Sequence, residues 1–190
     1  MTKKISEGYV PPQAVDVEES VLGELLLYHD YIDIVSEFLS PEHFYDEQNA
    51  LIYETILSVK SEDKKPDMLV VTQKLIKQGQ LDKAGGAAKL AYLTHKTGAA
   101  TNTEYHARII LEKYLRRAYI EFANQFAKSC YDETEDIFDT IDSNRIKYEN
   151  IDAQVVDESS MLFAWEIANK KIETLSKLVK EKVKVTGPLS

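Results

Sequence analysis

The stretch NTEYHARIILEKYLRRAYIEFANQFAKSCY, residues 102–131, decides the fold that we expect of this chain. It runs for 30 residues without a glycine or a proline, the two residues that most strongly disfavour a helix interior. A helix over this stretch would be about 45 Å long, at a rise of about 1.5 Å per residue. Its apolar side chains lie at helical spacing along one face: Ile109, Tyr114, Leu115, Ala118, Phe122 and Phe126. We therefore expect one helix that is much longer than the usual helix of a small domain.

The residues after this helix predict a turn and a second helix. Residues 132–136 read Asp-Glu-Thr-Glu-Asp, and acidic side chains favour the N-terminus of a following helix through its macrodipole. The apolar residues beyond them lie at helical spacing: Ile137, Phe138, Ile141 and Ile146. We expect an antiparallel helical hairpin over residues 99–150. Because a hairpin that stands away from a head cannot bury both faces alone, its apolar stripe is expected to mediate self-association, through Leu115, Phe122, Phe126 and Phe138.

The residues before the long helix predict a compact helical head over residues 10–98. Asp16 is expected to cap the first helix, and Ser40-Pro41 places a capping serine before a proline at the first helical position. A helix is expected from about Asp46 to Val59, Asp67 is expected to cap the next, and Gly79 supplies the left-handed residue that commonly follows a helix. The expected fold class is all-α: a compact helical head, then a long antiparallel helical hairpin, then a separate linker helix.

The C-terminal part of the sequence predicts that linker helix. Residues 151–160 lack helical periodicity and are expected to form a hinge. Over residues 161–183 the apolar side chains form one amphipathic stripe: Met161, Trp165, Ala168, Ile172, Leu175 and Val179. A helix of this kind packs either on its own head or on another surface. The long hinge before it favours docking on a neighbouring molecule.

Composition argues against several classes of protein. The net charge is −9 at pH 7 and the isoelectric point is near 5.0, whereas a nucleic-acid surface needs an excess of Lys and Arg. We therefore expect no direct nucleic-acid binding. The single cysteine, Cys130, excludes an intrachain disulfide and suits a reducing cytoplasm. No apolar run approaches the roughly 20 residues that span a bilayer. Residues 1–9 are expected to form a disordered arm and not a signal peptide.

The sequence also lacks the side chains of a catalytic site. No glycine-rich loop ends in Lys-Ser or Lys-Thr, so there is no cradle for the phosphates of ATP. The histidines are scattered, and none lies at metal-ligand spacing from another ligand: His29, His43, His95 and His106. Glu18 and Glu19 are adjacent on a helix and do not face each other, so we interpret them as capping and solvated charges. We expect the chain itself to be no enzyme and to hold no metal and no cofactor.

Several short motifs occur in a fixed order along residues 9–187. They are Pro11-Pro12-Gln13, Glu18-Glu19-Ser20-Val21-Leu22-Gly23, Pro41-Glu42-His43-Phe44-Tyr45, and Gly79-Gln80-Leu81 followed by Gly85-Gly86. Further along come Tyr105-His106-Ala107-Arg108-Ile109 and Glu166-Ile167-Ala168. Together these motifs resemble the N-terminal, non-catalytic part of DnaB-type replicative DNA helicases, with the linker helix that follows it.

The resemblance implies a function in assembly. In this family the N-terminal domains pair into dimers, and three dimers form a collar on a hexameric motor. The linker helix docks on the ATPase domain of the neighbouring subunit, and the collar receives primase; a helicase loader is a further candidate partner. By position, Lys89, Ile120 and Phe126 lie where the family meets primase. ATP and Mg²⁺ belong to the ATPase domain, which residues 184–190 are expected to begin. The full-length protein would then be a cytoplasmic, ATP-dependent DNA helicase.

Two alternatives remain open at this point. One is a stand-alone adaptor that binds a helicase or a primase. The other is the helicase-binding domain of a primase, which shares the head-and-hairpin fold. Thr186-Gly187 resembles the residues just before a helicase ATPase domain, and this favours the helicase. The residues do not distinguish a chromosomal parent from one in a phage or a mobile element.

Overall fold

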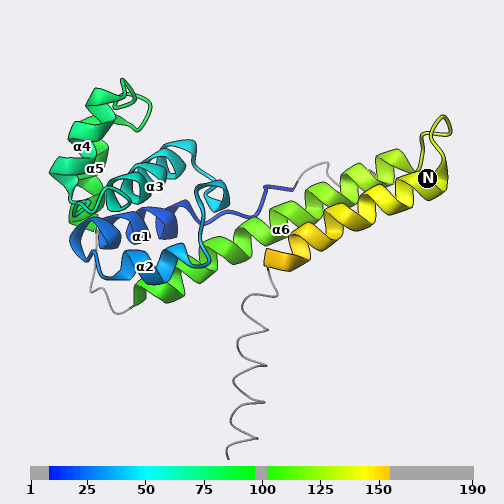
Figure 1. Ribbon diagram of the computed structural model, residues 1–190, viewed down its shortest axis with the longest axis horizontal. Coiled ribbons are helices and arrows are strands. Elements are labelled where there is room, and N and C mark those ends of the chain that lie inside the picture. The colour runs from blue at the N-terminus through cyan, green and yellow to red at the C-terminus, as the bar shows by residue number, and fades with distance from the viewer. Residues whose placement is uncertain (1–8, 97–101, 155–190) are drawn as a thin grey trace, which may run out of the picture. The chain divides into compact units, whose positions relative to one another are not determined.

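Every regular element of the described chain is a helix (Figure 1). The computed structural model describes residues 9–96 and 102–154. The helices are α1 (Val15–Leu27), α2 (Tyr31–Ser36), the 3₁₀ turn η1 (Pro41–His43), α3 (Glu47–Lys60), α4 (Met68–Lys77), α5 (Gly86–Lys96) and α6 (Thr103–Ser129), followed by a helix over residues 137–154. Within the described residues, the chain divides into two units between Asp142 and Ser143. The all-α fold class expected from the sequence is confirmed.

Most of the predicted helix ends are where the capping residues place them. Ser40 and Pro41 open η1, where Ser40 and His43 form a capping box. The Asp46 carboxylate accepts hydrogen bonds from the N–H groups of Gln48 and Asn49 at the start of α3, and Asp67 caps α4 in the same way. The prediction for the first helix was wrong. Ala14 is the N-cap of α1, and the Asp16 carboxylate instead accepts a hydrogen bond from Lys96.

α1 is the centre of the head. It packs against α3, α5 and α6. Because these helices cover it, its side chains Val21, Leu22, Leu25 and Leu26 are all buried. Each such side chain stabilises the fold by roughly 1.5–3 kcal/mol when it is fully removed from water. The same core includes Ile52, Tyr53 and Ile56 of α3, Val71 and Leu75 of α4, and Leu90 and Leu93 of α5. The head is thus one contiguous core built around α1.

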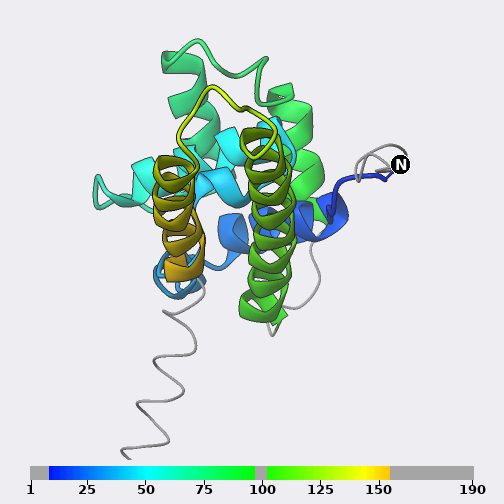
Figure 2. The same ribbon diagram turned by 90° about the vertical axis from the view of Figure 1, so that its right-hand side faces the viewer.

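α6 is the long helix that the sequence predicts, about 40 Å over its 27 residues. Its N-terminal half lies on the head, where Ala107, Ile110 and Leu111 are buried and Tyr114 is partly buried against the core. Figure 2 shows the turn of residues 130–136 that joins the end of α6 to the next helix. This order of long helix, short turn and second helix is the one expected of the hairpin.

The helix after the turn continues through residue 154, four residues into the stretch predicted as a hinge. Residues 151–154 lack an apolar period, but they contain neither glycine nor proline, and Ala153 and Gln154 are good helix formers. Nothing local therefore ends the helix at residue 150. The predicted linker helix at residues 161–183 lies outside the described residues, as do residues 1–8 and 184–190.

Candidate assembly and docking surface

The distal half of α6 carries an aromatic pair. The rings of Phe122 and Phe126 are one helical turn apart and stacked, with centroids 6.0 Å apart and planes inclined by 14°. Both side chains are half-buried, whereas Ile120 is 48% exposed. Leu115 belongs elsewhere, because it packs against the core of the head. Of the α6 residues predicted for self-association, the structure therefore groups Phe122 with Phe126 and assigns Leu115 to the head.

The start of the next helix turns apolar side chains to solvent. Phe138 is 73% exposed, Ile137 is 47% exposed and Ile141 is 40% exposed, while Thr140 is only 3% exposed. This helical stretch thus exposes its apolar residues and buries a polar one. Clustered exposed apolar side chains of this kind commonly mark a protein–protein contact. Phe138, predicted for self-association, is the most exposed of them.

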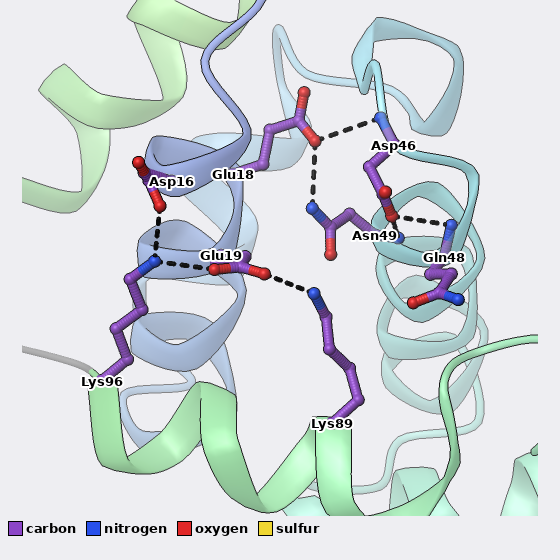
Figure 3. Close-up of polar contacts among 8 residues, drawn as sticks. All are labelled: Asp16, Glu18, Glu19, Asp46, Gln48, Asn49, Lys89 and Lys96. Atoms are coloured by element: carbon purple, nitrogen blue, oxygen red, sulfur yellow. Dashed lines mark hydrogen bonds and ion pairs between the residues drawn. The ribbon is translucent and has the colours of Figure 1, made fainter.

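Lys89, predicted for primase docking, lies in an ion-pair network between α1 and α5 (Figure 3). Its ammonium group forms an ion pair with the Glu19 carboxylate. Lys96 donates to the same carboxylate over 2.7 Å and to the Asp16 carboxylate over 2.9 Å. Partial burial pushes the pKa of Glu19 upward, but the hydrogen bonds from Lys89 and Lys96 outweigh this and lower it. The Lys89 side chain therefore has a structural role in holding α5 to α1.

Glu18 is a buried carboxylate that fixes the entrance to α3. It is 1% exposed and accepts hydrogen bonds from the N–H of Tyr45 (2.7 Å), the N–H of Asp46 (3.3 Å) and the side-chain amide of Asn49 (3.1 Å). Figure 3 shows the last two of these contacts. The interpretation of Glu18 and Glu19 as solvated charges was wrong. Both are buried, and each carboxylate accepts hydrogen bonds from segments that are distant in sequence.

Arg117 is a residue of interest that sequence reasoning missed. Its guanidinium group donates to the carbonyl oxygen of Pro12 over 2.9 Å and to that of His43 over 2.8 Å. It also lies over the rings of Tyr45 and Tyr114, at 5.4 and 5.9 Å from the ring centroids. Partial burial lowers the pKa of Arg117, and the nearby Glu18 carboxylate opposes this shift.

A signal for Arg117 was present in the sequence. Residues 107, 110, 114 and 117 follow one another at helical spacing on the face of α6 that meets the head. The neighbouring Arg116 lies off this face and is exposed, in an ion pair with Glu112 on the same helix. Two adjacent arginines thus differ completely in environment.

Among residues 9–96 and 102–154, no three His, Cys, Asp or Glu side chains come together in a way that could hold a metal ion. No helix in this part of the chain is both long and apolar enough to cross a membrane. The candidate site is the group of apolar side chains on distal α6 and at the start of the helix that follows it, of which Phe138 is the most exposed.

Comparison with known proteins agrees with this geometry. Residues 10–112 match the family described as the DnaB-like helicase N terminal domain. The replicative DNA helicase DnaB of Rhodothermus marinus is 41% identical over 135 residues, which cover 71% of this chain and 14% of that protein. The solved N-terminal domain of DnaB helicase from Mycobacterium tuberculosis matches with a TM-score of 0.70 and 31% identity, over 74% of this chain and 99% of that one.

The fold thus defines an all-helical domain, and the chain belongs to the family of DnaB-like helicase N-terminal domains. A further structure with the same fold is the N-terminal domain of DnaB helicase from Helicobacter pylori, solved in a study of its interactions with primase. It matches with a TM-score of 0.54 and 24% identity, over 61% of this chain and 90% of that one. The chain spans only 14% of the length of the Rhodothermus helicase.

Proposed function

We propose that this chain is the N-terminal oligomerisation and primase-docking region of a hexameric replicative DNA helicase. The observation that carries the proposal is the exposed apolar start of the helix after α6, on a chain whose family is that of DnaB-like N-terminal domains. In the full-length helicase, ATP and Mg²⁺ would be bound by a separate ATPase domain. The full-length protein would act in the cytoplasm. The chain itself would not hydrolyse ATP, because it has no glycine-rich phosphate loop ending in Lys-Ser or Lys-Thr. It would not bind single-stranded DNA tightly, since its net charge is −9.

Self-association would cover the exposed side chains. Burying a phenylalanine or isoleucine side chain completely contributes roughly 1.5–3 kcal/mol. A symmetric dimer uses each side chain twice, because an isologous interface pairs the same patch from both copies. Phe138, Ile137 and Ile141 would supply this energy, together with the ring pair of Phe122 and Phe126. Dimers, and trimers of dimers in the full-length hexamer, are the assemblies that we propose.

Light scattering at increasing protein concentration tests this proposal. The wild-type chain should form dimers or larger species, and Phe138→Asp should shift the population to monomer while far-UV circular dichroism stays helical. Ile34→Asp is the matched control, because Ile34 is also an exposed apolar residue, at 42%, but lies on α2 in the head. It should assemble like the wild type. A wild-type chain that stays monomeric at millimolar concentration would contradict the proposal.

Primase docking is proposed at Ile120 and Phe126, with Lys89 in the head. Ile120 supports this, because it is an apolar side chain with about half of its surface in water. Lys89 is a weaker candidate, since its ammonium group already has Glu19 as a partner. In a calorimetric titration with the helicase-binding domain of a bacterial primase, Ile120→Asp should weaken binding and Ile34→Asp should not. Equal loss of binding in both variants would argue against a site on α6.

The remaining proposed contacts lie outside the described residues. Met161, Trp165, Ala168, Ile172, Leu175 and Val179 would form the stripe of a linker helix. We propose that it docks on the ATPase domain of a neighbouring subunit, and a helicase loader is a further proposed partner. The proposed division of the chain is accordingly head, hairpin, hinge and linker helix.

A further inference from the structure

Arg117 lies where the long helix leaves the head. Upstream of it, α6 is held by buried contacts at Ala107, Ile110 and Leu111. Downstream of it lies the aromatic pair of Phe122 and Phe126. The side chain therefore stands between the part of α6 that belongs to the core and the part that carries the candidate assembly surface.

The contacts of Arg117 connect segments that are far apart in sequence. One arm of its guanidinium fork holds the Pro12 carbonyl, 105 residues away, and the other holds the His43 carbonyl, 74 residues away. The His43 carbonyl belongs to η1, and the Pro12 carbonyl belongs to residues 9–14, the segment ahead of α1, which is called the N-terminal arm from here on. A planar guanidinium can serve two acceptors at once in a fixed geometry, which a lysine ammonium on a flexible stem cannot reproduce.

Aromatic rings also contact the guanidinium group. It lies over the rings of Tyr45 and Tyr114, and the His43 ring packs on Tyr114 at 4.4 Å between centroids. Tyr45 is itself held by its N–H, which donates to the buried Glu18. The arrangement joins α6, η1, the N-terminal arm and α1 at one point.

The N-terminal arm depends on its contact with Arg117 more than the other segments do. Tyr9, Val10, Pro11 and Gln13 are exposed, and only Pro12 is half-buried. The hydrogen bond from Arg117 is therefore a main attachment of the arm ahead of α1. A motif that the sequence singles out, Pro11-Pro12-Gln13, thereby receives a structural role.

We propose that Arg117 is the positioning residue for self-association: it fixes the direction of α6 relative to the head, and the N-terminal arm is part of that joint. A tilt of α6 at Arg117 displaces the residues beyond it in proportion to their distance along the helix. From Arg117 to Phe126 is about 14 Å at about 1.5 Å per residue, so a tilt of about 10° moves Phe126 by about 2 Å. Since packed apolar atoms lie within about 4–4.5 Å of each other, such a shift disrupts an interface. This inference rests on the proposed function for its consequence in assembly.

The test measures the direction of the helix independently of assembly. Cys130, the single cysteine, is exposed just beyond α6, and Gln73→Cys adds a second exposed label site on α4. Double electron–electron resonance between spin labels at these sites, with the labelled chain diluted in unlabelled chain, reports the intramolecular distance. Arg117→Gln should shift the mean distance by about 3 Å or broaden the distribution correspondingly, because Cys130 is about 20 Å from Arg117 along the helix.

Arg116→Gln is the matched control, because it removes the same charge from the same helix but loses only an exposed pair with Glu112. It should leave the distance unchanged. Arg117→Lys should rescue the distance only partly. A chain that starts at Gln13, with every described helix intact, should reproduce part of the Arg117→Gln effect even if Arg117→Gln itself fails to fold. The same distance distribution in Arg117→Gln and Arg116→Gln would overturn the proposal, and so would an unchanged distance on removal of the arm.

The experiments distinguish failure of the proposed role of Arg117 from failure of the proposed self-association. If the wild-type chain does not self-associate, the proposed function fails, but the distance measurement still decides whether Arg117 positions α6. If the wild type assembles, the Arg117→Gln variant should show weaker assembly by light scattering than Arg116→Gln. If the spin-label distance shifts in Arg117→Gln but both variants assemble equally, the direction of α6 does not control assembly. The proposed function would remain intact.

Discussion

Replacing Glu18 by glutamine tests how the head holds the entrance to α3. One oxygen of the Glu18 carboxylate accepts the N–H of Tyr45, and the other accepts the N–H of Asp46 and the side-chain amide of Asn49. A glutamine keeps only one acceptor oxygen and presents an NH₂ group to the remaining donors. At least one buried N–H then loses its partner, whichever way the amide is oriented.

The magnitude follows from these contacts. A buried donor without a partner costs about 1–3 kcal/mol, and each hydrogen bond that changes from a charged to a neutral acceptor loses about 1 kcal/mol. We therefore expect Glu18→Gln to lower the free energy of unfolding by about 3 kcal/mol. The melting temperature should fall by about 6–12 °C, since a chain of this size loses about 2–4 °C per kcal/mol.

Urea unfolding followed by circular dichroism at 222 nm measures this loss. Glu104→Gln is the control, because Glu104 is an exposed partner of Arg108 one turn away on the same helix. An exposed pair of this kind contributes only about 0.3–0.5 kcal/mol. If Glu18→Gln and Glu104→Gln have the same unfolding midpoint, the reasoning about the buried carboxylate is refuted.

Two further predictions concern the way α5 is held in the head. Because the pKa of Glu19 is lowered in the folded chain, its stabilising contribution is complete above its ordinary pKa of 4.5 and is lost as the pH falls through the lowered value. In urea titrations below pH 4.5, Glu19→Gln should therefore lose less stability on acidification than the wild type; parallel curves would contradict this. Gly85→Ala should destabilise more than Gly79→Ala in thermal melts. Both glycines have positive φ, but a Cβ at Gly79 would meet nothing within 4 Å, whereas one at Gly85 would lie 3.0 Å from the Cβ of Lys89, an atom that cannot move without the α5 backbone. Equal melting temperatures would show that the close approach has no energetic effect.

Local sequence signals predicted the framework of the fold well. The absence of glycine and proline over residues 102–131 predicted α6 almost to its ends. The predicted helix start near Asp46 and the predicted cap Asp67 agree with the starts of α3 and α4. These predictions succeeded because each feature depends on the backbone of the same segment or on a side chain within three residues of it.

The polar contacts between distant segments of the head could not be predicted in the same way. Glu18 and Arg117 have their partners 27 to 105 residues away, and only the folded chain brings them together. Leu115 was grouped with Phe122 and Phe126 by spacing, but α6 passes from the head to its distal half between these positions. The apolar stripe of the hairpin was recognised, while its orientation toward solvent at Phe138 depends on tertiary packing.

Site-specific photo-cross-linking from position 138 tests the central claim most directly. The claim is that the apolar face at the start of the helix after α6 lies between copies of the chain. A benzophenone side chain at Phe138, in the chain at concentrations where it assembles, should yield cross-linked dimers on irradiation. Peptide mapping should locate the second cross-linked residue on another copy. The same group at Ile34, which is also exposed, should yield monomer. Only intramolecular cross-links from position 138, or equal dimer yields from both positions, would contradict the account.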